Sequence, residues 1–166
     1  MDKIIFLDID GVLNCIETFI QTNGFRKAYI NFYKNNYNID YLFQEQMLEI
    51  DFKKVMVLKE IIEKTNAKIV VTSAWRLLRT YPLIEEKLIE IGLPIIGVTK
   101  RLKNRGEEIL DYINEHEIKE YIIIDDEIFD DFTEEQKYNL VQTNFYNEGL
   151  TEEHIYDVYE KLGLKK

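Results

Sequence analysis

The sequence predicts an α/β fold of three layers, with a mostly parallel central sheet and helices on both of its faces. Short runs of β-branched and aromatic residues alternate along the chain with longer segments of helical periodicity. This alternation is typical of βαβ units, in which a helix connects two parallel strands. The chain has 166 residues, enough for one domain with a substantial core. We therefore expect a single domain over residues 1–166.

Strands are expected where short apolar runs end in turn-forming residues, as KIIFL (3–7) ends before Asp and Gly. The expected strands are 3–7, 68–72, 93–99, 120–124 and 140–144, with weaker patterns at 93–99 and 140–144. The expected helices are 51–66, 81–92, 104–116 and 151–163. Asp51 is a residue type that favours the N-cap of the first helix, and Pro82 and Gly92 fit the two ends of the second.

Residues 15–50 interrupt this alternation. They are rich in Asn, Tyr and Phe and follow directly on the first strand and its acidic residues. We expect a partly helical insertion that forms a small cap or flap, with its aromatic residues serving as the core of that cap more readily than as a platform for stacking bases.

Composition and charge exclude several classes of protein. The formal net charge of −10 argues against a protein that coats duplex nucleic acid, which needs a basic face. No apolar run approaches the roughly 20 residues of a membrane helix, and the N-terminus lacks a signal-peptide cleavage pattern. The single cysteine, Cys15, cannot form an internal disulfide. We expect a cytoplasmic protein without a membrane partner.

Polar residues follow three of the expected strands. Because ligands bind at the carboxyl ends of parallel strands, we expect these residues to converge at one edge of the sheet. They are Asp8 and Asp10 after the first strand, Thr72, Ser73 and Arg76 after the second, and Asp125 and Asp126 after the fourth.

Such a set of residues suits phosphoryl transfer. An aspartate can attack phosphorus and form an aspartyl-phosphate, and a second acid two residues on can protonate the leaving oxygen. Several carboxylates together favour Mg²⁺, and a hydroxyl group with a cation can hold the phosphate oxygens. Asp10-Gly11 is also a good type I′ hairpin turn, which is the competing interpretation. The hairpin interpretation does not explain why a second acid, Asp8, stands at the end of an apolar strand.

The same stretches resemble motifs of the haloacid dehalogenase (HAD) superfamily. DIDGVLN (8–14) is similar to its first motif, VVTSAWR (70–76) to its second, and IIDDEIFD (123–130) to its acidic fourth. TSAWR with the later RGEEI is also similar to small HAD domains associated with nucleic-acid end repair. The resemblance implies a Rossmann-like α/β/α sandwich and a Mg²⁺-dependent phosphatase.

The resemblance also implies roles for the first two motifs. Asp8 would be the nucleophile and a Mg²⁺ ligand. Asp10 would be the general acid and base, with its backbone carbonyl also on the metal. Thr72 would bind the phosphoryl group, with Ser73 as the alternative.

The later motifs carry the remaining implied roles. Asp126 would ligate Mg²⁺, assisted by Asp125 directly or through water. The cation of the third motif would be Arg105, at the start of a helix, ahead of Lys103. Arg76 would add a contact to a substrate phosphate.

The leading hypothesis is a Mg²⁺-dependent phosphohydrolase that cleaves a phosphomonoester through an aspartyl-phosphate. The substrate would be a phosphorylated small molecule, a nucleotide or a single-stranded nucleic-acid end. A phosphotransferase would differ only in the molecule that accepts the phosphate. A dehalogenase is disfavoured, because the loss of halide needs no acid such as Asp10. The alternative from another class is a non-catalytic phosphate-binding or regulatory module on the same fold.

Overall fold

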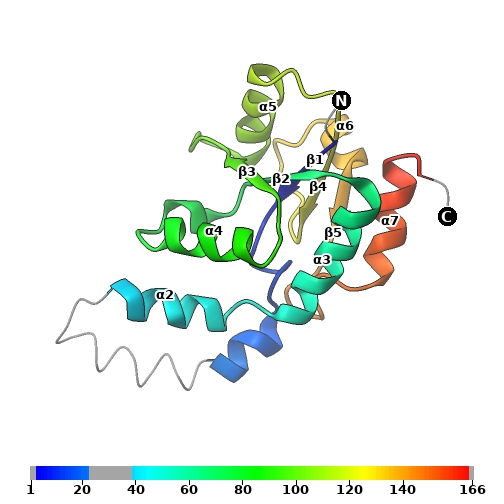
Figure 1. Cartoon of the computed structure of the whole chain (residues 1–166). Coiled ribbons are helices and arrows are strands. Elements are labelled where there is room, and N and C mark those ends of the chain that lie inside the picture. Colours follow the sequence, from blue (N-terminus) through cyan, green and yellow to red (C-terminus); the bar gives the residue numbers. More distant parts are fainter. Residues whose placement is uncertain (1–2, 23–38, 165–166) are drawn as a thin grey trace.

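The computed structural model describes residues 3–22 and 39–164, and a five-stranded sheet lies at its centre (Figure 1). The strands run in the order β3-β2-β1-β4-β5, and every neighbouring pair is parallel. The predicted parallel sheet is confirmed. The hairpin interpretation of Asp10-Gly11 is wrong, because the preceding strand pairs in parallel with both neighbours. The strands are β1 (Lys3–Leu7), β2 (Lys68–Val71), β3 (Ile95–Val98), β4 (Glu120–Asp125) and β5 (Leu140–Gln142).

The helices fall mostly where periodicity predicts them. Those expected are α3 (Phe52–Thr65), α4 (Tyr81–Glu90), α5 (Arg105–Glu115) and α7 (Glu153–Lys161). Helix α2 (Ile39–Leu48) lies in the insertion, which was expected to be partly helical. The sequence did not predict the short 3-10 helix η1 (Ala74–Leu77) or α6 (Glu134–Tyr138), which begins with a capping box. Residues 16–22 are helical as well, so the described parts of the 15–50 insertion are largely helical; residues 23–38 lie outside the described residues.

The sheet has an apolar core on each face, as the alternation of side chains in a strand requires. One face packs against α3, α4 and α7, through residues such as Leu58, Leu88 and Val158. The other face packs against α5, through Ile109 and Tyr112. This gives the predicted three layers. None of the helices in the described ranges is long and apolar enough to cross a membrane.

The N-terminus of α3 is fixed by Asp51. Its Oδ1 accepts the Lys53 N–H at 2.9 Å, and its Oδ2 pairs with the Lys54 ammonium at 2.9 Å. Its own N–H donates to the Leu13 carbonyl at 2.8 Å, which ties the start of α3 to the turn after β1. Partial burial opposes ionisation of Asp51, but the bonds from Lys54 and Lys53 outweigh it and lower the pKa of the carboxyl.

We expect Asp51→Ala to lower the free energy of unfolding by about 1–2 kcal/mol, because it removes both the cap and the partner of the largely buried Lys54. Asp51→Asn keeps a capping oxygen and should cost less. Since the pKa of Asp51 is lowered, its charge contributes at neutral pH and the contribution fades below pH 3.8, where an ordinary aspartate protonates. Urea unfolding at several pH values measures this. Glu63→Ala, an exposed change on the same helix, is the control and should alter stability by no more than about 0.5 kcal/mol.

Candidate active site

Three neighbouring strands each place a polar residue at the same level of the sheet. Leu7 pairs with Val71 and with Ile124, so the next residues, Asp8, Thr72 and Asp125, lie side by side. Two residues earlier on each strand are Phe6, Val70 and Ile123, which belong to the core under α5. Because side chains two apart in a strand share a face, this apolar surface gives way to a polar one at the carboxyl edge.

Arg105, the first residue of α5, joins all three polar residues. Its Nη1 donates to Thr72 Oγ1 at 2.9 Å and to Asp125 Oδ2 at 3.0 Å, and it lies 3.7 Å from Asp8 Oδ1. The guanidinium also lies over the Phe129 ring, 5.1 Å from its centroid. Lys103, the alternative cation, is exposed. The helix that covers this face therefore brings Arg105, the preferred candidate, to the strand ends.

Arg76, which was expected to contact a substrate phosphate, is bonded to backbone carbonyls and to a buried glutamate. Its guanidinium donates to the backbone carbonyls of Thr72, Ser73 and Thr99, and it forms a 2.7 Å ion pair with Glu108 of α5. Glu108 is itself buried and lies 4.0 Å from Arg105 Nε. These bonds favour a structural role for Arg76, in place of the predicted contact with a substrate phosphate. Glu108 was missed because nothing in its helical pattern distinguishes it from a surface acid.

Asp10 is held by two groups that sequence reasoning did not assign to the site. The indole N–H of Trp75 donates to Asp10 Oδ2 at 3.0 Å, and the amide of the buried Asn14 donates to Asp10 Oδ1 at 2.8 Å. Asn14 Oδ1 in turn accepts the Gly11 N–H at 2.9 Å. The position of Trp75, three residues after Thr72, could have indicated this contact, because a buried indole N–H usually has a hydrogen-bond partner.

Ser73 and Thr72 are both buried but have different partners. Ser73 begins η1, where its hydroxyl oxygen accepts the Trp75 N–H at 3.3 Å. A hydrogen bond from the same side chain favours the charged form of Asp8, whereas the Thr72 hydroxyl accepts from Arg105. Both predicted hydroxyls thus lie at the carboxylates, one beside Asp8 and one beside the cation.

Gly11 makes room for Asp126. It has φ +75°, a conformation that favours glycine, and a Cβ atom here would lie 2.3 Å from Cγ of Asp126. Its carbonyl accepts the Thr143 hydroxyl at 2.7 Å, which joins the turn after β1 to the loop after β5. The turn after β1 therefore packs directly against the carboxylate that follows β4.

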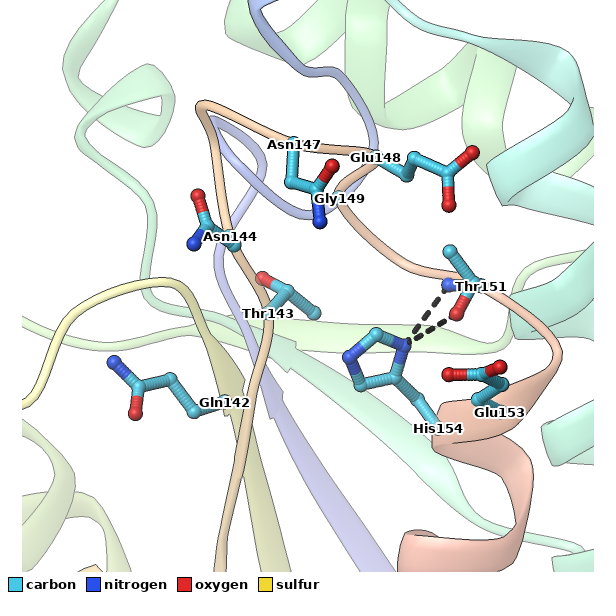
Figure 2. A pocket seen from close by; sticks show the side chains of 9 residues that line it. All are labelled: Gln142, Thr143, Asn144, Asn147, Glu148, Gly149, Thr151, Glu153 and His154. Carbon is cyan, nitrogen blue, oxygen red and sulfur yellow. Dashed lines mark hydrogen bonds between the residues drawn. The ribbon is translucent and has the colours of Figure 1, made fainter.

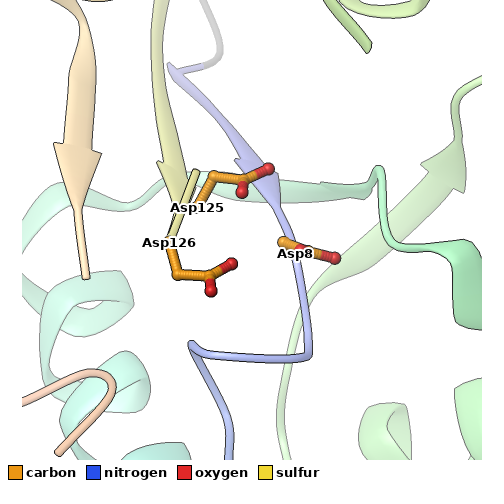
Figure 3. A group of neighbouring side chains, drawn as sticks. All are labelled: Asp8, Asp125 and Asp126. Atoms are coloured by element: carbon orange, nitrogen blue, oxygen red, sulfur yellow. The ribbon is translucent and has the colours of Figure 1, made fainter. Parts of the chain in front are cut away.

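Asp8, Asp125 and Asp126 form a compact group of carboxylates (Figure 3). One oxygen from each lies within 4.8 Å of the others. Burial is the main cause that raises the pKa of each: the pKa of Asp125 to about 8 and of Asp126 to about 6, with the charge of Asp8 adding to both. Burial also raises the pKa of Asp8, against the opposing effects of Arg105 and Ser73. Oxygen donors that repel one another at this spacing fit a hard divalent cation such as Mg²⁺.

A cavity of about 460 Å³ opens above these groups. Acidic side chains and Arg105 line it, together with aromatic rings from three separate segments. One ring, Phe19, belongs to the helical part of the insertion, as expected if the insertion contributes to a cap. The residues that line the cavity are Asp8, Asp10, Phe19, Arg105, Asp126, Glu127, Phe129, Phe145 and Tyr146.

A second pocket, of about 400 Å³, lies between the loop after β5 and the start of α7 (Figure 2). His154 lies in it, and its Nδ1 accepts the Thr151 N–H at 3.0 Å and lies 2.9 Å from the Thr151 hydroxyl. These bonds fix the turn that leads into α7. These bonds give His154 a structural role at this turn.

Comparison with known proteins agrees with the fold. The family described as "HAD domain in Swiss Army Knife RNA repair proteins" matches residues 4–155. Searches of curated proteins and of solved structures each found no match. The matched span covers the five strands apart from Lys3, together with the residues of the candidate site, and it confirms the resemblance to HAD domains of nucleic-acid end repair. The chain belongs to the family of HAD domains found in Swiss Army Knife RNA repair proteins.

Proposed function

We propose that this HAD domain is a Mg²⁺-dependent phosphatase that hydrolyses a phosphomonoester through a phosphorylated Asp8. Membership of a HAD family supports phosphatase-type chemistry in RNA repair. The observation that carries the proposal is the meeting of Asp8, Arg105 and Asp126 in one cavity, with Asp10 beside them. A nucleophile, a cation, a metal ligand and an acid thus lie within reach of a single phosphate group.

The reaction would take two steps. A carboxylate oxygen of Asp8 attacks phosphorus, the bond from phosphorus to the ester oxygen breaks, and Asp10 gives its proton to that leaving oxygen. Water then attacks the phosphorus of the aspartyl-phosphate, Asp10 takes the proton of the water, and the bond to Asp8 breaks to release inorganic phosphate. Arg105 with Thr72 or Ser73 would hold the phosphate oxygens on which negative charge is concentrated.

Mg²⁺ would be held by Asp8, Asp126 and the backbone carbonyl of Asp10. Both oxygens of Asp125 are already engaged, with Arg105 at 3.0 Å and with the Glu127 N–H at 3.0 Å, which favours its assistance through water. When bound, the metal would neutralise the phosphate and offset the repulsion between the carboxylates.

The first test is hydrolysis of a panel of phosphomonoesters by the wild-type protein and by Asp8→Asn. The panel should include p-nitrophenyl phosphate, nucleotides and short oligoribonucleotides phosphorylated at the 5′ or the 3′ end. We expect Mg²⁺-dependent release of phosphate by wild type, which EDTA abolishes. Asp8→Asn should lower kcat by about 10³-fold or more, because an amide cannot form the aspartyl-phosphate.

Asp157→Asn, an exposed change on α7, serves as the matched control and should retain wild-type activity. No turnover of any compound by wild type would leave the non-catalytic, phosphate-binding module as the better account. Full activity in Asp8→Asn would remove Asp8 as the nucleophile. Transfer of phosphate to an added alcohol in place of water would identify a phosphotransferase.

A second prediction concerns Trp75, a positioning residue for Asp10. Trp75→Phe keeps an aromatic ring but removes the N–H that donates to Asp10. We expect kcat for a nucleoside phosphate to fall roughly 10-fold with little change in KM, because the acid is less well aligned. The loss should be smaller for p-nitrophenyl phosphate, whose leaving group needs no proton. An equal loss on both substrates, or a raised KM alone, would contradict the positioning role.

A third prediction concerns the contact between Gly11 and Asp126. Gly11→Ala forces a Cβ into the space of the Asp126 carboxylate, so we expect weaker Mg²⁺ binding in calorimetric titration. Gly163→Ala is the matched control, since Gly163 also has positive φ but nothing lies within 4 Å of its added Cβ. Both variants should lose roughly 1 kcal/mol of stability from backbone strain, whereas only Gly11→Ala should lose metal affinity. Equal Mg²⁺ affinity in the two variants would contradict the role of the contact.

A further inference from the structure

One aromatic side chain at the cavity, Tyr146, is unusually exposed. Tyr146 has 82% of its surface exposed, the largest fraction among the exposed large hydrophobic side chains of the described residues. Its ring packs edge-on against Phe145 at 5.3 Å between centroids, and Phe145 packs in the same way against Phe19 at 5.6 Å. Most of the Tyr146 ring is therefore open to solvent while its inner side is supported.

The backbone around Tyr146 is tightly hydrogen-bonded. The Tyr146 N–H donates to the side chain of Asn144 at 2.9 Å, and the Asn144 carbonyl accepts from Asn147 and Gly149 at 3.2 and 3.0 Å. Figure 2 shows Asn144, Asn147 and Gly149 in the loop after β5. The Phe145 carbonyl accepts the Ile16 N–H at 2.7 Å. Because these bonds hold the backbone that carries Tyr146, little of its conformational entropy remains to be lost when a ligand covers the ring.

The charge of the cavity limits how a substrate can be bound. The carboxylates of Asp8, Asp10, Asp126 and Glu127 outnumber the single cation, Arg105, among the residues that line it. A phosphate group needs both the cation and the metal here, so the cavity offers little further electrostatic attraction to a polyanion. Binding energy for the rest of the substrate has to come from contacts that do not depend on charge.

We propose that Tyr146, supported by Phe145, is a stacking platform for the nucleobase that adjoins the phosphate to be removed. The inference rests on the proposed function and narrows its substrate to phosphate esters that carry a base, on a mononucleotide or an unpaired strand end. Stacking on an aromatic ring accepts every base, because each has a π face, and it requires that the base be unpaired. Phe129, beside Arg105, gives the cavity a further aromatic surface.

The test uses two short oligoribonucleotides that differ only in the terminal nucleotide, which bears adenine in one and is abasic in the other. Both carry the phosphate at the end that the protein hydrolyses. We expect wild type to prefer the base-bearing oligonucleotide by roughly 10-fold to 100-fold in kcat/KM. Tyr146→Ala should bring this ratio close to one, and Tyr146→Phe should retain most of it. Tyr138→Ala, which removes a ring that is 70% exposed on α6, should leave the ratio unchanged.

Equilibrium binding of the same two oligonucleotides to Asp8→Asn separates this inference from the proposed function. Tighter binding of the base-bearing oligonucleotide, lost on adding Tyr146→Ala, supports the platform even if wild type shows no hydrolysis. Hydrolysis of both oligonucleotides at equal kcat/KM by wild type would overturn the platform while leaving the phosphatase intact. A preference that survives Tyr146→Ala would also overturn it, since the base would then be bound elsewhere.

Discussion

The contact of one guanidinium with three strand ends is the interaction on which the rest of the site depends. Parallel pairing carries Asp8 and Asp125 to the same level of a buried sheet edge, where two carboxylates repel each other and lose hydration. Arg105 lies against both and also donates to Thr72. Removing one partner of such a buried group costs several kcal/mol, about 3–5 by analogy with buried ion pairs. The start of α5 therefore fixes the position of the cation, whose charge opposes the effect of burial on the pKa of Asp8 and of Asp125.

The cation is in turn held by groups that never face the cavity. Glu108, one turn along α5, lies between Arg105 and Arg76, and Arg76 binds the carbonyls that follow β2. The contacts among Arg105, Glu108 and Arg76 hold α5 against the strand ends. They also offset the free-energy cost of burying each charge. Arg76 thus contributes to the site by holding its framework. A lysine at this position could not reach several carbonyls and a carboxylate at once, because it lacks the fork of donors that arginine has.

Sequence reasoning succeeded where the chemistry is local and failed where it is distant. The strands were predictable because each is a short apolar run, and Arg105 was predictable because a basic residue at a helix start is unusual unless an anion lies nearby. The bond from Trp75 to Asp10 spans 65 residues, and the pair between Arg76 and Glu108 spans 32. No local pattern marks such partners. The bounds of α2 were not predicted, because this helix lies in an insertion whose composition also favours loops.

The acidic and the aromatic residues that line the cavity interact with a substrate in different ways. The acidic half repels the anionic parts of a substrate, apart from the phosphate that Arg105 and the proposed metal would hold. The aromatic half carries no charge, and stacking works beside carboxylates without being weakened by them. An enzyme with a basic groove would attract duplex and single strand alike. The platform proposed at Tyr146 would favour ends whose bases are free to stack, because the acidic centre offers a polyanion little attraction beyond the phosphate that Arg105 can hold.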